Sequence, residues 1–198
     1  PTIIVSPNGH EPIRECLNTS GVAAHLVVQP EPRGMGDAVL QFDQSPAFAN
    51  AEHVLLVWGD VPFIKPETVA TMVKAHITHN NDFTFATRLV DSAYTVVSRD
   101  AAGQVTGVVE TREQDIAAPQ AGERDIGLFI FRKAVVLDAL REELSGKWGK
   151  STGDHGFLYV ICHLVARGLR VVALPIASEL DLVSLNSVQD VAILSKRL

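Results

Sequence analysis

The sequence predicts an α/β protein with a mixed, mainly parallel sheet and helices on both faces of that sheet. Short apolar runs typical of buried strands alternate with helical stretches through most of the chain, which is the pattern of strand–helix–strand units. Residues 96–99 and 104–110 flank a turn-forming segment at 100–103, which predicts an antiparallel hairpin inserted in the second half. No repeat or linker divides the chain, so a single domain over residues 1–198 is predicted.

Apolar runs bounded by proline, glycine or polar residues predict the strands, and apolar residues at helical spacing predict the helices. In the first half these are a strand at 2–5, a loop at 6–9, a short helix at 12–17, a strand at 25–29, a helix from 37, a strand at 54–57 and a helix at 67–79. In the second half they are a strand at 82–90, the hairpin, an irregular segment at 111–123, a strand at 126–131, helices at 134–144 and 155–166, a strand at 169–174 and a closing helix at 187–198.

The segment around which these elements are arranged is HVLLVWGDVPFIKPE, residues 53–67. Its wholly apolar run at 54–57 suits a central strand buried on both faces, and Pro66 followed by Glu67 predicts a helix start. Asp60 is therefore expected in a loop just past the carboxyl end of that strand, where ligands bind in open α/β sheets. A carboxylate at this place can hold a divalent cation or fix a hydroxyl, or it can cap the turn.

Composition and charge narrow the classes of function. The formal net charge of -6 argues against a nucleic-acid partner, because phosphate backbones bind to basic faces. Cys16 and Cys162 form neither a disulfide framework nor a metal-type pair, which predicts two reduced, buried thiols in a cytoplasmic protein. No apolar run reaches membrane-spanning length and no secretory leader is present, so no membrane partner is expected.

Three common catalytic patterns are absent from the sequence. It contains neither G-x-S-x-G nor G-x-x-x-x-G-K-[ST], which argues against a nucleophile-elbow hydrolase and a phosphate loop of that type. His76 and His79 lie three residues apart on a predicted helix, but no carboxylate follows them in a zinc pattern. We therefore expect these histidines on a solvated face.

The remaining candidates are polar residues and glycines at strand ends. Gln29, Gly34 and Gly36 can form a backbone cradle for a ligand, or an ordinary strand-to-helix turn. Glu110 can hydrogen-bond a polyol, or it can be an exposed strand terminus. Asn186, taken alone, is accounted for as a helix cap.

Together and in this order, five segments resemble the sugar-1-phosphate nucleotidyltransferase family, the NDP-sugar pyrophosphorylases. VVQPEPRGMGDAVL resembles the family's Q-x-E-x-x-G-T-G-H-A-V segment, and VLLVWGDVPFI resembles its strand ending in Y-G-D-x-P-L. VTGVVETREQ resembles I-V-E-x-K-D, RDIGLFIFRKAVVLDAL resembles I-N-T-G-I-Y-x-F, and VSLNSVQDVAIL resembles G-V-N-x-x-x-x-L. The resemblance covers essentially the whole chain and is closest to the bacterial N-acetylglucosamine-1-phosphate uridyltransferase branch.

The resemblance implies a Rossmann-like, nucleotide-diphospho-sugar transferase fold and a Mg²⁺-dependent reaction. An NMP group, from UTP above other NTPs, would pass to a sugar-1-phosphate such as N-acetylglucosamine-1-phosphate, with release of pyrophosphate. The implied metal ligands and catalytic residues are Asp60 and Asn186. The implied nucleotide-binding residues are Gln29, Gly34, Met35 and Gly59, and the implied substrate-binding residues are Trp58, Glu110 and Asp125. The partners expected are the NTP and the sugar-1-phosphate, and the formation of a homo-oligomer stays open.

The chain departs from the family at three site positions and at its front. Met35 stands where the family has threonine, Trp58 where it has tyrosine and Asp125 where it has asparagine. A methionine cannot make the hydrogen bond of the threonine, and Asp125 adds an anion near the sugar phosphate. The family's first strand and its glycine-rich loop L-A-A-G-x-G-T-R-M have no counterpart, and residues 2–5 align with the second strand. We therefore expect that an N-terminal part of the domain is omitted from this sequence, and that catalysis is poor without it.

Two alternative functions stay open. The first is a non-catalytic module that binds or senses a nucleotide sugar, favoured by the absent front loop and by Met35 and Asp125. The second is a nucleotidyltransferase of the same fold that acts on a non-sugar phosphate, against which Glu110 and the sugar-side segments weigh. Release of pyrophosphate distinguishes an enzyme from a binding module.

Overall fold

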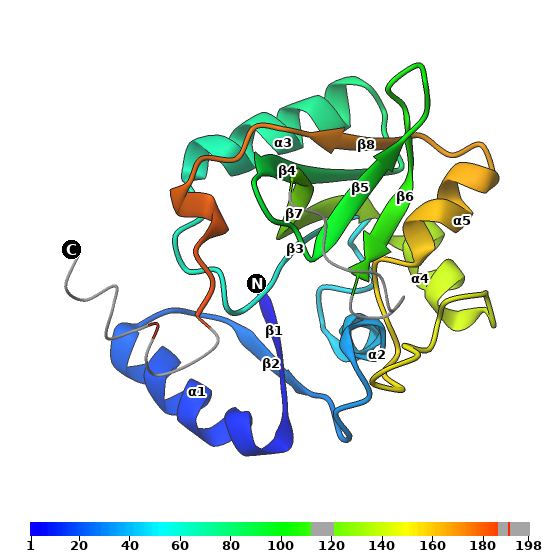
Figure 1. The fold of residues 1–198 in the computed structure, drawn as a ribbon. Helices are drawn as coiled ribbons and strands as arrows, with labels where there is room; N and C mark the ends of the chain where they lie inside the picture. Colours follow the sequence, from blue (N-terminus) through cyan, green and yellow to red (C-terminus); the bar gives the residue numbers. More distant parts are fainter. Residues whose placement is uncertain (112–120, 186–189, 191–198) are drawn as a thin grey trace.

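The computed structural model describes residues 1–111, 121–185 and 190 of the chain, and strands and helices alternate along most of it (Figure 1). The elements are β1 (Thr2–Val5), α1 (Pro7–Ser20), β2 (His25–Val28), α2 (Met35–Leu40), η1 (Gln41–Gln44), β3 (His53–Val57), α3 (Pro66–Thr78), β4 (Phe83–Val90), β5 (Thr95–Arg99), β6 (Val105–Glu110), β7 (Gly122–Arg132), α4 (Lys133–Arg141), α5 (Val160–Ala166), β8 (Val171–Leu174) and η3 (Leu180–Leu182). The predicted closing helix at 187–198, with Asn186, lies outside the described residues except for position 190.

The described strands form one four-stranded sheet and two smaller pairs. The large sheet has the order β3-β7-β4-β8; β4 and β8 are parallel, and β7 is antiparallel to both β3 and β4. β1 and β2 form a separate parallel pair, and β5 and β6 form the predicted antiparallel hairpin. The predicted mixed α/β class is therefore confirmed, with β3, β4 and β8 running one way and β7 between them running the other.

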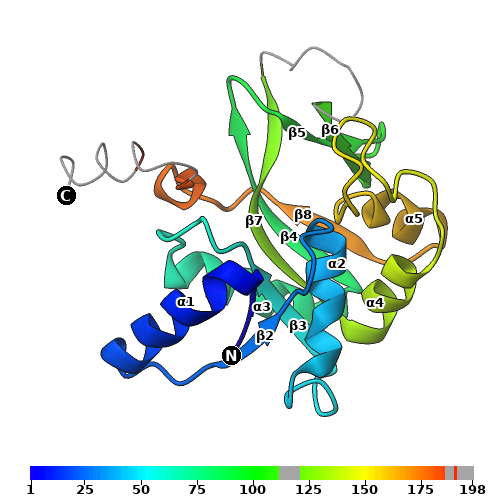
Figure 2. The same ribbon diagram turned by 90° about the horizontal axis from the view of Figure 1, so that it is seen from below.

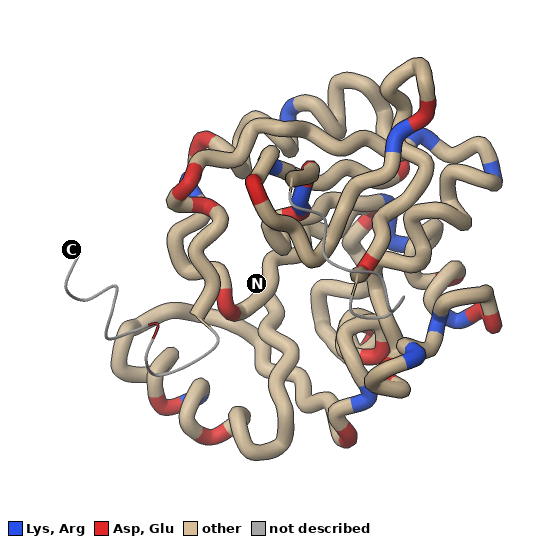
Figure 3. Tube along the Cα trace, in the orientation of Figure 1, with Lys and Arg blue, Asp and Glu red and all other residues tan. Residues whose placement is uncertain are grey.

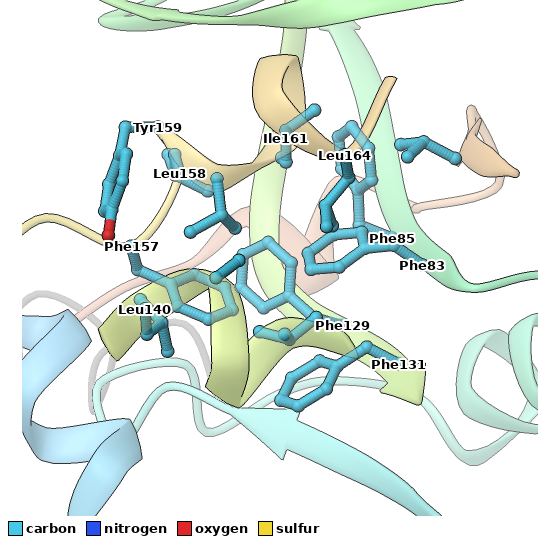
Figure 4. Close-up of a cluster of buried hydrophobic side chains, with 14 of the residues drawn as sticks. Phe83, Phe85, Phe129, Phe131, Leu140, Phe157, Leu158, Tyr159, Ile161 and Leu164 are labelled. Atoms are coloured by element: carbon cyan, nitrogen blue, oxygen red, sulfur yellow. The ribbon is translucent and has the colours of Figure 1, made fainter. Parts of the chain in front are cut away.

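Helices cover both faces of the large sheet, as the class requires (Figure 2). On one face, five phenylalanines form the centre of the main core: Phe83, Phe85, Phe129, Phe131 and Phe157 (Figure 4). They pack against α4 and α5. The other face buries Leu128, Ile130 and Ala86 against Met72 of α3. Alternate residues of β4 and β7 thus serve two cores, because side chains of a strand point to opposite faces.

Strand β3 lies at an edge of the sheet, so the prediction of a central strand buried on both faces is wrong. Leu55 and Val57 are 45% and 44% exposed, because β7 is the single described strand that pairs with β3. β1 likewise pairs with β2 and with no other described strand. The apolar run predicts a strand correctly, but its burial depends on neighbours that the run itself does not encode.

The segment at 6–9 is the first turn of a helix and not the predicted loop. Pro7 occupies the start of α1, and the backbone N–H of Gly9 donates to the hydroxyl of Ser6 over 3.3 Å. Serine before a helix and proline at its first position are both helix-start signals. The later helix at 155–166 is shorter than predicted, since α5 begins at Val160.

His76 is fully buried, which contradicts its predicted place on a solvated face; His79 is exposed. Its Nδ1 lies 2.9 Å from the hydroxyl of Thr84 on β4, and its Nε2 lies 2.9 Å from Nδ1 of His53 on β3. Asn81 donates to the same Thr84 hydroxyl over 3.0 Å. The histidine therefore ties α3 to two strands, and a polar network accounts for its burial.

Both cysteines are unpaired, as predicted, but they are exposed and not buried. Cys16 lies on α1, a helix without a single buried residue. Cys162 lies on α5 with its Cβ near Gly107 of β6, and its Sγ donates to the carbonyl of Tyr159 over 3.2 Å. None of the described helices combines the length and the apolar sequence needed to cross a bilayer.

Candidate functional site

A cavity of about 190 Å³ lies beside the loop that follows β3. Its walls come from that loop, from the start of β5, the end of β6, the bulged part of β7 and the segment after η3. The lining residues are Trp58, Asp60, Val61, Tyr94, Thr95, Glu110, Arg124, Asp125, Ile126, Gly127, Leu158, Leu182 and Ser184. Four residues predicted for the site from sequence, Trp58, Asp60, Glu110 and Asp125, therefore meet at one cavity. Gly59 lies between two of them in the chain, with open space around its Cα.

Strand β7 is bulged where it borders this cavity. The pairing of β4 with β7 passes from Phe85–Phe129 to Thr87–Asp125, so β7 accommodates extra residues around Gly127. Gly127 has φ of 73°, a left-handed conformation that glycine adopts without strain. A bulge of this kind changes the direction of neighbouring side chains, and four consecutive residues of β7, Arg124 to Gly127, line the cavity.

Trp58 packs directly over this bulge. Its backbone N–H donates to the carbonyl of Gly127 over 3.0 Å, and a Cβ on Gly127 would lie 2.1 Å from Cδ1 of the indole. The ring makes edge contacts with Phe129 and Phe157, at 5.7 and 6.2 Å between centroids. Its Nε1 is buried and has no acceptor among the described residues. The cavity wall thus contains a fixed indole with an unsatisfied donor, which a ligand oxygen could accept.

Asp60 is held next to the segment that follows η3. Its backbone carbonyl accepts from the N–H of Leu185 over 2.7 Å. Asp181 anchors that segment and is completely buried: its carboxylate accepts from Lys65 N, Thr68 Oγ1, Ser178 N and Ser178 Oγ over 2.7, 3.2, 2.7 and 2.7 Å. Burial acts to raise the pKa of Asp181, but these hydrogen bonds outweigh it and the pKa lies below its usual value.

The second predicted metal ligand, Asn186, lies outside the described residues. Leu185 is the last described residue before it, and Leu185 is the residue that bonds to Asp60.

Asp125 is buried, with 8% of its surface exposed. One carboxylate oxygen accepts from the hydroxyl of Thr95 over 2.6 Å, and the other accepts from the N–H of Gly127 over 3.0 Å. Burial raises the pKa of Asp125, while these hydrogen bonds and the charge of Arg124 oppose the rise. Asp125 thus braces the bulge of β7 in addition to bordering the cavity.

Arg124 and Tyr94 belong to the site, although sequence reasoning did not select either. The guanidinium lies over the Tyr94 ring, 4.1 Å from the centroid, and its Nη2 donates to the Tyr94 hydroxyl. Burial raises the pKa of Tyr94. Arg124 and Asp125 pair in regular register with Arg88 and Thr87 on β4, next to the bulge, and both line the cavity. The sequence signal for Arg124 was the charged pair Arg124–Asp125, which stands where the family segment I-N-T-G-I-Y-x-F has isoleucine and asparagine.

The segment from Gln29 to Gly36 forms a second group, away from this cavity. The Gln29 amide donates to the carbonyl of Gly34 over 3.1 Å and to Asp37 Oδ2 over 2.7 Å. The N–H of Gly36 donates to the His155 carbonyl over 2.9 Å. Gly34 has φ of 103°, and Met35 packs against the main core. Beside the segment is a second hollow of about 210 Å³, lined by Pro30, Glu31, Arg33, Asp37 and Gln41.

Both glycines of this segment are required by close packing. A Cβ on Gly34 would lie 2.6 Å from the carbonyl oxygen of His155, and a Cβ on Gly36 would lie 2.1 Å from that of Gly156. The turn is thus pressed against the loop before α5. Of the two interpretations made from sequence, the ordinary tight turn accounts for both glycines, and a role of their backbone in nucleotide binding stays a prediction.

Residues 1–163 match the family described as "Nucleotidyl transferase". The chain belongs to this family. The resemblance that the five sequence segments carry is therefore confirmed.

Relatives with the printed name bifunctional protein GlmU match the chain over different lengths. The protein of Symbiobacterium thermophilum is 32% identical over 199 residues, covering 99% of this chain and 41% of that protein. The protein of Streptococcus agalactiae serotype V is 29% identical over 148 residues, covering 72% of this chain and 31% of that protein. The chain thus spans well under half the length of these relatives.

Among solved structures, HddC from Yersinia pseudotuberculosis has a similar fold. The TM-score is 0.58 and the sequence identity 13%, and the match covers 88% of this chain and 69% of that one. At this identity the likeness concerns the fold alone, and it agrees with the predicted class.

Proposed function

We propose that this nucleotidyltransferase-family chain transfers an NMP group from an NTP, with UTP as the first candidate, to a sugar-1-phosphate such as N-acetylglucosamine-1-phosphate. An oxygen of the sugar phosphate attacks the α-phosphorus of the NTP, a new P–O bond forms, and the bond to the β-phosphate breaks with release of pyrophosphate. The observation that carries the proposal is the meeting of Trp58, Asp60, Glu110 and Asp125 at one cavity in a chain of this family.

Each side chain has a role in this proposal that follows from its chemistry. Glu110 accepts hydrogen bonds from sugar hydroxyls, as a carboxylate can. The indole of Trp58 donates from a buried Nε1 to a ligand oxygen and forms an apolar wall. Catalysis by such residues consists mainly of positioning and of charge stabilisation, as is general for phosphoryl and nucleotidyl transfer.

Mg²⁺ is the proposed cofactor, held by Asp60 and Asn186. The carboxylate and amide oxygens of these residue types suit a hard cation that keeps several waters and binds few protein ligands. When bound, Mg²⁺ would supply charge neutralisation for the phosphates.

The NTP would be bound by the second group, Gln29, Gly34 and Met35, together with Gly59 of the loop that follows β3.

Lysines and arginines alternate with acidic residues along the described chain and form no continuous basic stripe (Figure 3). This dispersal supports small phosphorylated substrates over a nucleic acid, since a nucleic-acid interface concentrates basic residues on one face.

The experiment is a pyrophosphate-release assay with Mg²⁺, in which UTP, dTTP, CTP and GTP are each paired with several sugar-1-phosphates. We expect one NTP and one sugar-1-phosphate to give turnover, and Asp60→Asn to lower it by at least about a hundredfold, as for the loss of an electrostatic catalytic group. Asp43→Asn is the matched control, because Asp43 makes an exposed ion pair with Arg141 at 3.7 Å. Binding of an NDP-sugar without any pyrophosphate release would replace the proposal by the binding-module alternative.

A further inference from the structure

Arg124 is the single positively charged residue among the described residues that line the Asp60 cavity, and the wall also carries the carboxylates of Asp60, Glu110 and Asp125. The carboxylate of Glu110 suits sugar hydroxyl groups, and that of Asp60 suits a metal cation. Asp125 has both of its oxygens engaged by Thr95 and Gly127. The charge of Arg124 favours the ionised form of Asp125, but the hydrogen bonds of the Asp125 carboxylate come from Thr95 and Gly127 and not from the guanidinium.

The hydrogen bonds of Arg124 are incomplete. A guanidinium carries five N–H donors in a fixed plane, and the protein bond assigned to it is that from Nη2 to the Tyr94 hydroxyl. Its Nε is buried and has no acceptor among the described residues. A buried donor without an acceptor costs about 1–3 kcal/mol, and Arg124 lines the cavity, so a small movement of the side chain that brought this donor to a ligand oxygen would remove that cost.

The position of the guanidinium is also fixed before any ligand binds. It lies 4.1 Å from the centre of the Tyr94 ring, and its backbone pairs in regular register with Arg88 of β4. Contact with an aromatic face limits the motion of the plane and leaves its edge for in-plane hydrogen bonds. The edge of a guanidinium matches two oxygens of a carboxylate or phosphate.

We propose that Arg124 binds an oxyanion of the acceptor substrate and so selects substrates whose glycosyl part presents one at this wall. The identification of the ligand as the acceptor substrate rests on the proposed function. The oxyanion site itself rests on the cavity, on the unsatisfied Nε of Arg124 and on the single positive charge among the described lining residues. Two sources share the chemistry: the phosphate on carbon 1 of the sugar, and a second acidic group on the sugar ring.

Binding is measured by NMR on ¹⁵N-indole-labelled protein with Mg²⁺. The resonance of Trp58 Nε1–H reports on the cavity, and that of Trp148, which is 49% exposed, is the internal reference. The probes are methyl glucoside, glucose 1-phosphate and glucuronic acid 1-phosphate, together with UTP as a ligand of the other group.

Arg124→Met removes the charge and the donors and retains an apolar stem over Tyr94, whereas Arg124→Lys retains the charge without the planar edge. Arg88→Met is the matched control, because Arg88 lies opposite Arg124 on β4 but does not line the cavity.

We expect Arg124→Met to weaken sugar-phosphate binding by about tenfold to a hundredfold, the range for hydrogen bonds to charged groups, while UTP binding changes less than about twofold. Arg124→Lys should fall between the two, and Arg88→Met should match the wild type. An equal loss for glucose 1-phosphate and glucuronic acid 1-phosphate assigns the contact to the carbon-1 phosphate. If the wild type binds glucuronic acid 1-phosphate more tightly than glucose 1-phosphate, and this preference disappears in Arg124→Met, the contact of Arg124 is with the second acidic group on the sugar ring.

The inference is overturned if Arg124→Met binds both sugar phosphates as tightly as the wild type, because Arg124 would then be a brace for Tyr94. It is also overturned if the wild type binds neither compound. Arg124-dependent binding without pyrophosphate release from any NTP would support the oxyanion site and reject the transfer reaction, so the two proposals fail separately.

Discussion

The buried His76 predicts a loss of stability on mild acidification. Its side chain is fully buried between α3 and the sheet, and burial lowers its pKa from 6.5 to about 4, helped by the charges of His53 and Arg132 and opposed by that of Asp82. Thr84 accepts a hydrogen bond from Asn81 and can donate its own proton to Nδ1 of His76. The neutral imidazole then donates from Nε2 to His53, so the network is complete without a charge on His76.

The size of the effect follows from proton linkage. Because the folded pKa of about 4 lies below the unfolded value of 6.5, the unfolded chain binds more protons between these values. The contribution of His76 to stability is therefore complete above pH 6.5 and is lost as the pH falls toward 4. At 1.36 kcal/mol per pKa unit, the loss between pH 7.5 and pH 5 is about 2 kcal/mol, and about 3 kcal/mol below pH 4.

The assay is urea unfolding followed by tryptophan fluorescence at pH 7.5 and pH 5, for the wild type and for His76→Gln. The variant lacks the titrating group, so its free energy of unfolding should fall by about 2 kcal/mol less than that of the wild type over this range. His79→Gln, at an exposed position three residues further on, should retain the wild-type difference. The reasoning is refuted if His76→Gln shows the wild-type pH dependence, or if NMR shows that the imidazole of His76 titrates near pH 6.5.

Two further predictions concern packing and anchoring near the two groups of site residues. Gly36→Ala places a Cβ 2.1 Å from the carbonyl oxygen of Gly156, so calorimetry should give a loss of about 1–3 kcal/mol, whereas Gly59→Ala, with open space around it, should stay within about 0.5 kcal/mol of the wild type. Equal melting temperatures for these two variants would contradict the packing. Asp181→Ala removes the acceptor of four donors, of which Thr68 Oγ1 is buried and the others are partly buried, and should cost about 3 kcal/mol in urea unfolding at neutral pH. The cost should shrink in strong acid, because the carboxylate with a lowered pKa stabilises the fold only while it is ionised. An unchanged urea midpoint at neutral pH would reject this anchor.

Much of the fold could be predicted from local pattern. The strands at 2–5, 25–28 and 53–57, the hairpin of β5 and β6 and the helix α3 all lie where apolar runs and turn residues place them. These features depend on neighbours within a few residues, and the sequence displays such neighbours directly. The motif order also predicted that Trp58, Asp60, Glu110 and Asp125 would serve one site, and they line one cavity.

Features that depend on partners distant in the chain were predicted wrongly or not at all. The apolar run of β3 predicts burial on both faces, yet Leu55 and Val57 are exposed because β3 has one described neighbour. His76 has the sequence context of a surface histidine, yet its hydrogen bonds come from β3 and β4. The direction of β7 between β3 and β4 is equally invisible in its residues, since parallel and antiparallel pairing accept the same apolar strand.

The sequence by itself determined the α/β class, the position of most elements and the family, because each of these is written in periodicity or in the order of short motifs. The tertiary structure alone decided which residues of β7 reach the cavity. The bulge between Asp125 and Phe129 is held by Trp58, which packs over Gly127, and by the hydrogen bond that the Gly127 N–H donates to Asp125. The shape of this wall therefore depends on Trp58, a residue far away in the chain that the sequence of β7 does not reveal.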